Sequence, residues 1–155
     1  QLAGYRSKGG KVIFDSNYRP KLWPGHEATR RAYEAMYRLT DVALPTLEDE
    51  QQLFGDADEN GIIERLQSWG VGEIALKMGG QGCLVASAEA RELVAANKVA
   101  VVDTTSAGDS FNAGYLAARL KGQGASDAAR AGHRLASVVI QHRGAIIPAS
   151  AMPAD

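Results

Sequence analysis

The sequence predicts an α/β fold, a doubly wound and mostly parallel sheet with helices on both faces. Short apolar segments alternate with longer amphipathic segments through the first half of the chain, which is the pattern of a parallel sheet wrapped by helices. At 155 residues, of which 45% are hydrophobic, the chain can bury a substantial core. No linker or repeat divides it, so residues 1–155 are predicted to form one domain.

Residues 1–45 are expected to contain the first two strands and one amphipathic helix. Residues 1–10 resemble the end of a helix and a glycine-rich stop, which is typical of the middle of an α/β protein. We therefore expect the chain to be part of a longer one. Short apolar runs predict strands at residues 11–15 and 41–45, and apolar residues at helical spacing predict a helix over 26–39.

The next segment is expected to continue with two helices and an antiparallel extension of the sheet. Thr46 and Asp49 resemble a capping box that opens a short helix to about Leu53. A second helix is predicted to end at Gly70, a suitable C-cap. Strands are then expected at residues 73–78, 83–87, 90–96 and 98–103. The tight turn between the first two of these strands makes the sheet mixed.

Two helices, at about residues 109–121 and 126–142, and an extended segment at 144–148 complete the predicted fold. Three polar loops, at residues 15–19, 77–82 and 103–109, follow expected strand ends. In open α/β sheets, ligands bind outside the carboxyl ends of the strands. The sequence therefore predicts that the three loops converge on one edge of the sheet.

The composition of the chain disfavours nucleic acid and membranes as binding partners. The formal net charge is −1, so there is no basic excess for nucleic acid or anionic membrane. No apolar run approaches the ~20 residues that span a bilayer, and no signal peptide is recognisable. The one cysteine, Cys83, suits a reducing compartment and is expected to be a small buried hydrophobe. We expect a cytoplasmic protein, with self-association into a homo-oligomer left open.

The segment DTTSAGD at residues 103–109 predicts an anion site. Ser106, Ala107 and Gly108 offer consecutive backbone N–H groups at a helix start, where a phosphate group binds favourably. Asp109 at the same point suits the role of accepting a proton from a hydroxyl that attacks phosphorus. The alternative is that Asp109 only stabilises the start of its helix.

The longer run DTTSAGDSFNAGY at residues 103–115 resembles the C-terminal signature of ribokinase-family (PfkB-type) sugar kinases. The resemblance implies a ribokinase-like fold that uses ATP and Mg²⁺. It implies that Asp109 is the catalytic base and contacts the substrate hydroxyl, and that the amides of residues 106–108 form the anion hole. Only the second half of a family member is covered. The lid and most sugar contacts are therefore expected in a missing N-terminal half of the same enzyme.

Two other stretches resemble the same family. LKMGGQG is similar to the family's strand and turn along the nucleotide, which implies ATP contacts from Lys77, Met78, Gly79, Gly80, Gln81 and Gly82. The alternative for this stretch is a plain tight turn. FDSNYRPKLW resembles the kinases of 2-keto-3-deoxygluconate, in which Asn17 and Arg19 would approach nucleotide phosphate and Arg19 also the acid sugar. A guanidinium matches a carboxylate or phosphate with a planar fork, although a surface loop arginine is the alternative.

Two positions carry weaker implications. Many family members have Asn-x-x-Glu near the magnesium–phosphate site, whereas this chain has Thr46 to Asp49 there. Asp49 is accordingly the candidate metal residue, acting through water, with Glu48 as the other carboxylate for that role and helix capping as the alternative. His133 falls near the position that lies beside adenine in relatives, and the alternative is a histidine on a helix surface.

The sequence thus predicts ATP-dependent phosphorylation of the primary hydroxyl of a sugar acid, with 2-keto-3-deoxygluconate as the favoured substrate. Another ribokinase-family kinase, for fructose, ribose or a nucleoside, is one alternative. A non-catalytic nucleotide-binding module is the other, and the presence of Asp109 in an intact anion-hole run disfavours it.

Overall fold

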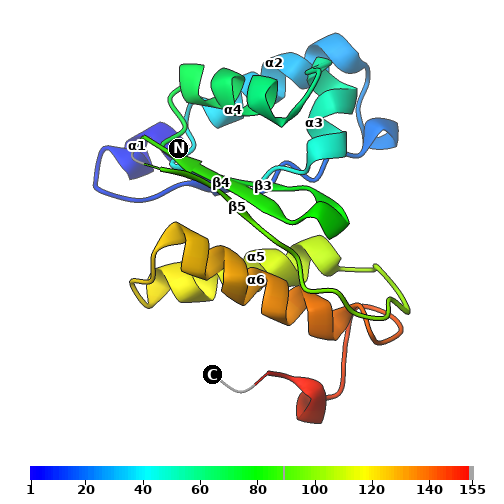
Figure 1. Ribbon diagram of the computed structural model, residues 1–155. Coiled ribbons are helices and arrows are strands. Elements are labelled where there is room, and N and C mark those ends of the chain that lie inside the picture. The colour runs from blue at the N-terminus through cyan, green and yellow to red at the C-terminus, as the bar shows by residue number, and fades with distance from the viewer. Residues whose placement is uncertain (89, 154–155) are drawn as a thin grey trace. The chain divides into compact units, whose positions relative to one another are not determined.

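The structure, a computed structural model, describes residues 1–88 and 90–153. In chain order its elements are α1 (Leu2–Arg6), β1 (Ile13–Phe14), η1 (Pro20–Leu22), α2 (His26–Tyr37), β2 (Val42–Ala43), α3 (Leu47–Phe54), α4 (Glu59–Ser68), β3 (Glu73–Lys77), η2 (Gly79–Gln81), β4 (Cys83–Ser87), β5 (Arg91–Val94), α5 (Ala107–Leu120), α6 (Ala125–Val139) and η3 (Ala149–Ala151) (Figure 1). They group into two compact units. Unit 1 holds residues 1–78 and 84–91, and unit 2 holds residues 79–83 and 92–155.

The strands form one five-stranded sheet in the order β1-β2-β3-β4-β5. The first three strands are parallel, and Ala43 pairs with Phe14 on one side and with Ile74 on the other. The connections between β3, β4 and β5 are short turns, which permit only antiparallel pairing of consecutive strands. The α/β class and the mixed sheet predicted from the sequence are therefore confirmed.

The core of unit 1 lies between its strands and the helices α2, α3 and α4, which gather over one face of β3 (Figure 1). Phe14 belongs to an aromatic cluster, with its ring 5.6 Å from that of Tyr33 and 5.1 Å from that of Tyr37. Both contacts are edge-to-face, which is a favourable geometry for aromatic pairs. Helix α2 is thereby held against β1, the strand that leads into the 15–19 loop.

Helix α4 is capped by Asp58 at its start and ends where its sequence predicts, at Gly70. The Asp58 carboxylate accepts hydrogen bonds from the N–H groups of Asn60 and Gly61, which satisfies two donors of the first turn. At the other end Gly70 has a φ of 91°. Its N–H donates to Gln67 O, and the next N–H donates to Leu66 O. This is a Schellman ending, which favours glycine at the left-handed position.

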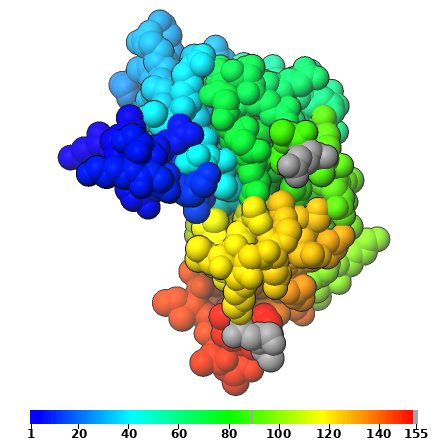
Figure 2. Space-filling model, turned by 90° about the vertical axis from the view of Figure 1, so that its left-hand side faces the viewer, coloured from blue at the N-terminus to red at the C-terminus, as the bar shows by residue number. Residues whose placement is uncertain are grey.

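The N-terminal helix α1 lies on the outside of unit 1. None of its residues is buried, and Figure 2 shows the segment (dark blue) as a projection from the surface. The Arg6 guanidinium donates to Asp41 Oδ1 at 3.0 Å, and the Val12 N–H donates to the other oxygen of the same carboxylate. Polar contacts to Asp41 therefore tie α1 and the start of β1 to the unit.

Helices α5 and α6 of unit 2 lie side by side (Figure 1) and meet at two glycines. A Cβ on Gly132 would lie 2.8 Å from the backbone oxygen and the ring of Phe111, and one on Gly114 would lie 2.8 Å from Ala131 O. These distances leave no room for a methyl group. The two backbones can approach this closely only because both residues are glycine.

Two local expectations are wrong. Residues 98–103 form no strand. Instead, the N–H groups of Val102 and Asp103 both donate to the Ile140 carbonyl, near the end of α6. The helix predicted after Thr46 is present, but Thr46 makes no capping hydrogen bond. Asp49, the expected partner in that capping box, accepts a hydrogen bond from the Tyr18 N–H instead.

A methyl group at Gly132 would fall in the contact between α5 and α6, whereas one at Gly61 would lie outside it, on α4. Opposite effects on stability are therefore expected for alanine at these two positions. Gly132→Ala is expected to destabilise the protein by about 1–3 kcal/mol, because the methyl group overpacks against Phe111. Gly61→Ala is the matched control, since its Cβ would meet only ordinary contacts at 3.7 Å or more. That change is expected to stabilise α4 by up to about 1 kcal/mol. Thermal unfolding of both variants checks this, and an equal effect of the two changes would contradict it.

Candidate phosphate-binding and catalytic site

The carboxyl ends of the parallel strands bring two predicted loops of unit 1 together. Asp15 follows β1 directly, and Lys77 is the last residue of β3. Their side chains form an ion pair at 3.1 Å, although 62 residues separate them in the chain. The isolated parallel bridge between Thr46 and Lys77 places the start of α3 at the same level. The expected convergence of the 15–19 loop with the end of β3 is therefore confirmed within unit 1.

The 15–19 loop has an uncommon backbone conformation. Asn17 has a φ of 34°, which few residues other than glycine adopt and which asparagine tolerates best. The next residue, Tyr18, is buried, and its N–H donates to Asp49 Oδ2 at 3.2 Å. The side chains of Asn17 and Arg19 are exposed, and Arg19 donates to the Tyr18 carbonyl. The loop thus presents the two predicted phosphate-binding side chains outward from a buried anchor.

Asp49 has the environment of a carboxylate that would gain from a cation. Burial raises the pKa of Asp49, and the Tyr18 N–H together with the charges of Arg19 and Lys77 offsets this only in part. Among residues 1–88 and 90–153 there is no cluster of three or more metal-binding side chains. Mg²⁺ commonly binds through one or two carboxylates, waters and substrate phosphates. A single carboxylate such as Asp49 therefore fits a magnesium ion that arrives with a nucleotide.

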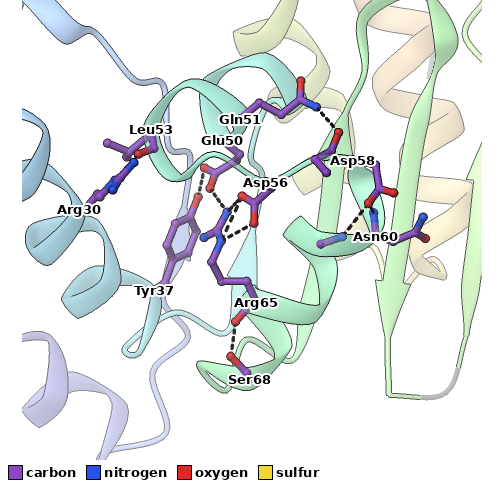
Figure 3. Close-up of polar contacts among 12 residues, drawn as sticks. Arg30, Tyr37, Glu50, Gln51, Leu53, Asp56, Asp58, Asn60, Arg65 and Ser68 are labelled. Carbon is purple, nitrogen blue, oxygen red and sulfur yellow. Dashed lines mark hydrogen bonds and ion pairs between the residues drawn. The ribbon is translucent and has the colours of Figure 1, made fainter.

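Glu50, beside Asp49, is the centre of a buried network that the sequence did not reveal. Its side chain is 1% exposed, and Figure 3 shows the Tyr37 hydroxyl and the Arg65 guanidinium directed toward its two oxygens. Arg65 also pairs with Asp56 and stacks 3.9 Å over the ring of Phe54. Burial raises the pKa of Glu50, while Tyr37 and Arg65 favour its charged form. The network fixes the inward face of α3.

The 103–109 segment of unit 2 is a hydrogen-bonded turn organised by Asp103. One carboxylate oxygen accepts from the N–H and the hydroxyl of Thr105 at 2.8 and 2.7 Å, and the other accepts from the Gly144 N–H at 2.8 Å. The Thr105 hydroxyl first, and then the two N–H groups, lower the pKa of Asp103 to about 2. Asp103 thus joins this turn to the segment that follows α6.

Ser106 turns the chain into α5 through a left-handed conformation, with φ 59° and ψ 19°. Of the three amides predicted to bind an anion, that of Ala107 donates to Thr104 O at 3.1 Å. Within the described part of the chain, the N–H groups of Ser106 and Gly108 make no hydrogen bond. Asp109 lies in the first turn of α5 with an exposed side chain. The helix start therefore offers free donors beside an accessible carboxylate.

In unit 2, Gly82 of the glycine-rich turn and His133 both lie against the Val94 carbonyl. Gly82 has a φ of 115°, and a Cβ there would lie 2.2 Å from Val94 O, so only glycine fits. The same carbonyl contacts His133 Nε2 at 3.2 Å. His133 is 8% exposed, so the alternative of a surface histidine is wrong. Its ring lies 5.0 Å from that of Phe111, two residues beyond Asp109.

The other residues of this stretch divide by exposure. Gly79, Gly80 and Gln81 are exposed, whereas Met78 is buried in the core of unit 1. The Met78 side chain therefore belongs to the core and does not reach a ligand. Lys77 is also largely buried, with its ammonium group paired to Asp15. The ATP contacts predicted for residues 77–82 stay a prediction, as does the convergence of the 103–109 loop with the 15–19 loop.

Backbone strain singles out the two loops in which phosphate contacts are predicted. Among the described residues, Asn17 and Ser106 are the non-glycine positions with positive φ. Such conformations cost free energy and are retained where the surrounding structure enforces them, often at functional sites. Each loop also has a carboxylate that holds a backbone N–H beside the strained residue, Asp49 for Tyr18 and Asp103 for Thr105.

Sequence reasoning assigned no role to Asp15, Tyr33, Glu50 or Asp103. A signal existed for Asp103, because an aspartate two residues before a threonine is typical of a side-chain-to-backbone turn. Glu50 lies three residues before the buried Leu53, on the inward face of α3. An acidic residue at a position that faces the core indicates a buried polar network. The partners of Asp15 and Tyr33 are distant in sequence, so no local pattern identifies them.

These features have counterparts in known proteins. The chain matches the pfkB family carbohydrate kinases over residues 1–152. Because the match covers nearly the whole chain, the chain belongs to the pfkB family of carbohydrate kinases. Separately, no helix in the described ranges is long and apolar enough to cross a bilayer.

Within that family, the chain is similar to proteins with a more specific name. The chain is 52% identical over 157 residues to a 2-dehydro-3-deoxygluconokinase of Dickeya dadantii, covering 99% of this chain and 51% of that protein. It is 39% identical to the 2-dehydro-3-deoxygluconokinase of Haemophilus influenzae, covering 95% of this chain and 48% of that protein. The chain therefore spans about half the length of these relatives.

Solved structures agree with the fold. An aminoimidazole riboside kinase from Salmonella enterica, in complex with its riboside and an ATP analogue, has a TM-score of 0.85 at 26% identity. It covers 98% of this chain and 53% of that one. A putative ribokinase II from E. coli, in complex with ATP and Mg²⁺, has a TM-score of 0.82 at 27% identity, over 92% of this chain and 46% of that one. The ribokinase-like fold class is therefore confirmed.

The Asp103 turn predicts a measurable pH dependence. The pKa of Asp103 is depressed from an unfolded value of about 3.9 to about 2. Its contribution to stability is therefore complete above pH of about 4 and is lost as the pH falls toward 2. In an NMR titration the amide signals of Thr105 and Gly144 should move together with a midpoint near 2. Asp103→Asn should abolish that titration, and a midpoint near 4 in the unsubstituted protein would refute the assignment.

Proposed function

We propose that the protein containing this chain is an ATP-dependent kinase of a sugar acid, 2-keto-3-deoxygluconate, which it phosphorylates on the primary hydroxyl. The observation that carries the proposal is the start of α5. There the left-handed Ser106 leaves N–H groups free beside the exposed carboxylate of Asp109. The identity of 52% to 2-dehydro-3-deoxygluconokinases supports the choice of substrate. The proposal includes a cytoplasmic location and a second half of the enzyme that supplies the lid and most sugar contacts.

In the proposed reaction Asp109 accepts the proton of the primary hydroxyl. The hydroxyl oxygen forms a bond to the γ-phosphorus while the bond from that phosphorus to the β–γ bridging oxygen breaks, and ADP leaves. Charge on the transferred phosphoryl group is stabilised by the amides of Ser106 and Gly108 and by the start of the helix. The Ala107 amide contributes if it leaves Thr104 O. A carboxylate is a sufficient base because phosphoryl transfer depends mainly on positioning and charge stabilisation.

The loops of unit 1 and the glycine-rich turn bind the nucleotide in this proposal. Asn17 and Arg19 contact phosphate from the exposed side of their loop, and the Arg19 fork also pairs with the substrate carboxylate. The backbone of residues 77–82 lies along the nucleotide, with His133 near the adenine. Asp49 would hold a magnesium ion through water, and the ion would offset the charge of the nucleotide phosphates.

A neutral-sugar or nucleoside kinase of the same family is the competing function. Relatives at lower identity include a probable fructokinase of Arabidopsis thaliana, at 32% over 72% of this chain. Arg19 favours an acid substrate, because a neutral sugar leaves its guanidinium without a carboxylate. Steady-state assays of the full-length protein with 2-keto-3-deoxygluconate, fructose, ribose and a nucleoside separate these functions. The highest kcat/KM is expected for the sugar acid, and a higher value for any other substrate would overturn the choice.

Replacement of Asp109 tests the catalytic role in the full-length enzyme. Asp109→Asn keeps the shape and polarity of the helix start but removes the proton acceptor. The expected fall in kcat is about 10²- to 10⁴-fold. ATP affinity should hold or rise, since the base acts in the transition state and its charge repels the γ-phosphate.

Asp127→Asn is the matched control for Asp109→Asn. Asp127 is also an aspartate in the first turn of a helix, and it pairs with Arg130 on the surface of α6. Its replacement should leave kcat unchanged and alter stability by about 1 kcal/mol or less. A kcat of Asp109→Asn within about threefold of the wild type, like that expected for Asp127→Asn, would contradict the catalytic assignment. Such a loss is far smaller than the fall of about 10²- to 10⁴-fold that removal of a general base causes.

The 155-residue chain alone should be a poor enzyme that still binds nucleotide. The proposed sugar contacts lie mostly outside it, whereas the proposed ATP contacts lie within it. We expect negligible turnover of 2-keto-3-deoxygluconate by the purified chain, together with weak binding of ATP in a calorimetric titration. Full kinase activity of the isolated chain would show that the sugar site has been placed wrongly.

A further inference from the structure

The strained residue Asn17 lies between two hydrogen bonds that restrain the loop from opposite sides. The carbonyl of the preceding residue, Ser16, accepts from the Tyr33 hydroxyl at 2.7 Å. The N–H of the following residue, Tyr18, donates to Asp49 Oδ2 at 3.2 Å. One bond comes from α2 and the other from α3. The backbone of Asn17 therefore connects two anchored peptide groups.

The hydrogen bond between Tyr33 and Ser16 is buried and surrounded by aromatic rings. Tyr33 is 5% exposed and Ser16 is also buried. The Tyr33 ring packs edge-to-face against Phe14, Tyr18 and Trp23. Burial first, and then the nearby carboxylates, raise the pKa of Tyr33 to about 12. The hydroxyl therefore remains a hydrogen-bond donor throughout the physiological pH range.

The Asp49 side is held by the buried network next to it. Glu50, the adjacent residue of α3, is fixed by Tyr37 and Arg65. Successive residues of a helix are about 100° apart around its axis, as follows from 3.6 residues per turn. Fixing Glu50 toward the core therefore fixes the direction of Asp49. Tyr18 is in turn buried against Tyr33, with ring centroids 6.0 Å apart.

Hydrophobic packing alone explains why Tyr33 is aromatic but not why it carries a hydroxyl. A phenylalanine would preserve the ring contacts and would avoid burial of a polar group. The hydroxyl donates a hydrogen bond to the carbonyl that precedes the strained residue. Loss of that bond would leave Asn17 held from one side only. A relaxed φ at Asn17 would redirect its own side chain and that of Arg19, the two phosphate-binding candidates.

We propose that Tyr33 is a positioning residue for phosphate binding. Through the Ser16 carbonyl it holds Asn17 in the left-handed conformation and so sets the direction in which Asn17 and Arg19 meet the nucleotide. Asp49 holds the other side of Asn17 through the Tyr18 N–H. We call these two hydrogen bonds, Tyr33 to Ser16 O and Tyr18 N–H to Asp49, the clamp. The inference rests on the proposed function, because it deepens the role of the 15–19 loop. It assigns a function to a buried hydroxyl that need not touch the ligand.

The test compares Tyr33→Phe with Tyr37→Phe in the full-length protein. Both changes remove one buried hydroxyl from α2 and keep the ring. The Tyr33 hydroxyl donates to the backbone carbonyl of Ser16 in the loop, whereas the Tyr37 hydroxyl donates to the Glu50 carboxylate. Amide hydrogen exchange at Tyr18 reports the clamp directly. MgATP titration and steady-state kinetics report its consequence for the site, and thermal unfolding reports any general loss of stability.

Tyr33→Phe is expected to accelerate exchange at the Tyr18 amide and to raise the Kd for MgATP, each by about two- to twelvefold, the range for loss of one neutral hydrogen bond. Tyr37→Phe should lower the melting temperature, since Glu50 loses a donor. Arg65 still pairs with Glu50 in that variant and keeps the direction of Asp49. Tyr18 exchange and the Kd should therefore stay within about twofold of the wild type.

Two results would overturn the proposal. The first is Tyr18 exchange and a Kd for MgATP that are unchanged in Tyr33→Phe. The second is an equal rise in Kd for Tyr33→Phe and Tyr37→Phe, which indicates general destabilisation. If the wild-type protein binds no MgATP, the proposed function fails and the phosphate-binding part of the inference fails with it. Amide exchange at Tyr18 distinguishes failure of the proposed function from failure of the role of Tyr33, because it measures the hydrogen bonds of the loop without a ligand.

Discussion

Parallel pairing of β1, β2 and β3 is the constraint on which the candidate site depends. Because these strands run in the same direction and in a fixed register, the residues that follow them meet at one edge. Asp15 and Lys77 form an ion pair there across 62 residues of sequence. A shift of β1 by one residue would turn Phe14 out of the aromatic cluster. The register that builds the core of unit 1 therefore also positions the loops of unit 1 that contribute to the candidate site.

Each of the two phosphate-loop candidates is organised by a carboxylate that does not need to touch the ligand. Asp49 holds the Tyr18 N–H, and Asp103 holds the turn before Ser106. In both places the carboxylate stabilises a backbone that is otherwise unfavourable for a non-glycine residue. Preorganised N–H groups and side chains then require little rearrangement when an anion binds. Asp103 thus shapes its turn without a role in the proposed chemistry, whereas Asp49 combines a shaping role with its proposed role toward Mg²⁺.

Much of the fold was predictable because it depends on local patterns. Apolar periodicity located α2 and β3, and Gly70 marked the end of α4. The apolar run within residues 98–103 predicted a strand that is absent, because the N–H groups of Val102 and Asp103 bond to Ile140 instead of to a neighbouring strand. Propensity describes what a segment favours, whereas tertiary hydrogen bonds decide what it forms.

The site was predictable only where a motif is continuous in sequence. Residues 103–109 lie in one run, so the roles proposed for Asp109 and its neighbouring amides could be inferred from that run. The Tyr33–Ser16 bond and the Asp49–Tyr18 bond join positions 17 and 31 residues apart. The alternative that placed His133 on a surface failed because burial depends on the packing of α6 against Phe111. Contacts of this kind exist only once the chain has folded.

The most direct test of the account is an NMR titration of the full-length protein with ADP and Mg²⁺. In the proposed function, the left-handed turns at Asn17 and Ser106 both contact the nucleotide phosphates. The amide signals of Asn17, Tyr18, Gly108 and Asp109 should therefore shift along a common saturation curve with a single Kd. Amides of Gly108 and Asp109 that stay in place while those of Asn17 and Tyr18 saturate would contradict the account.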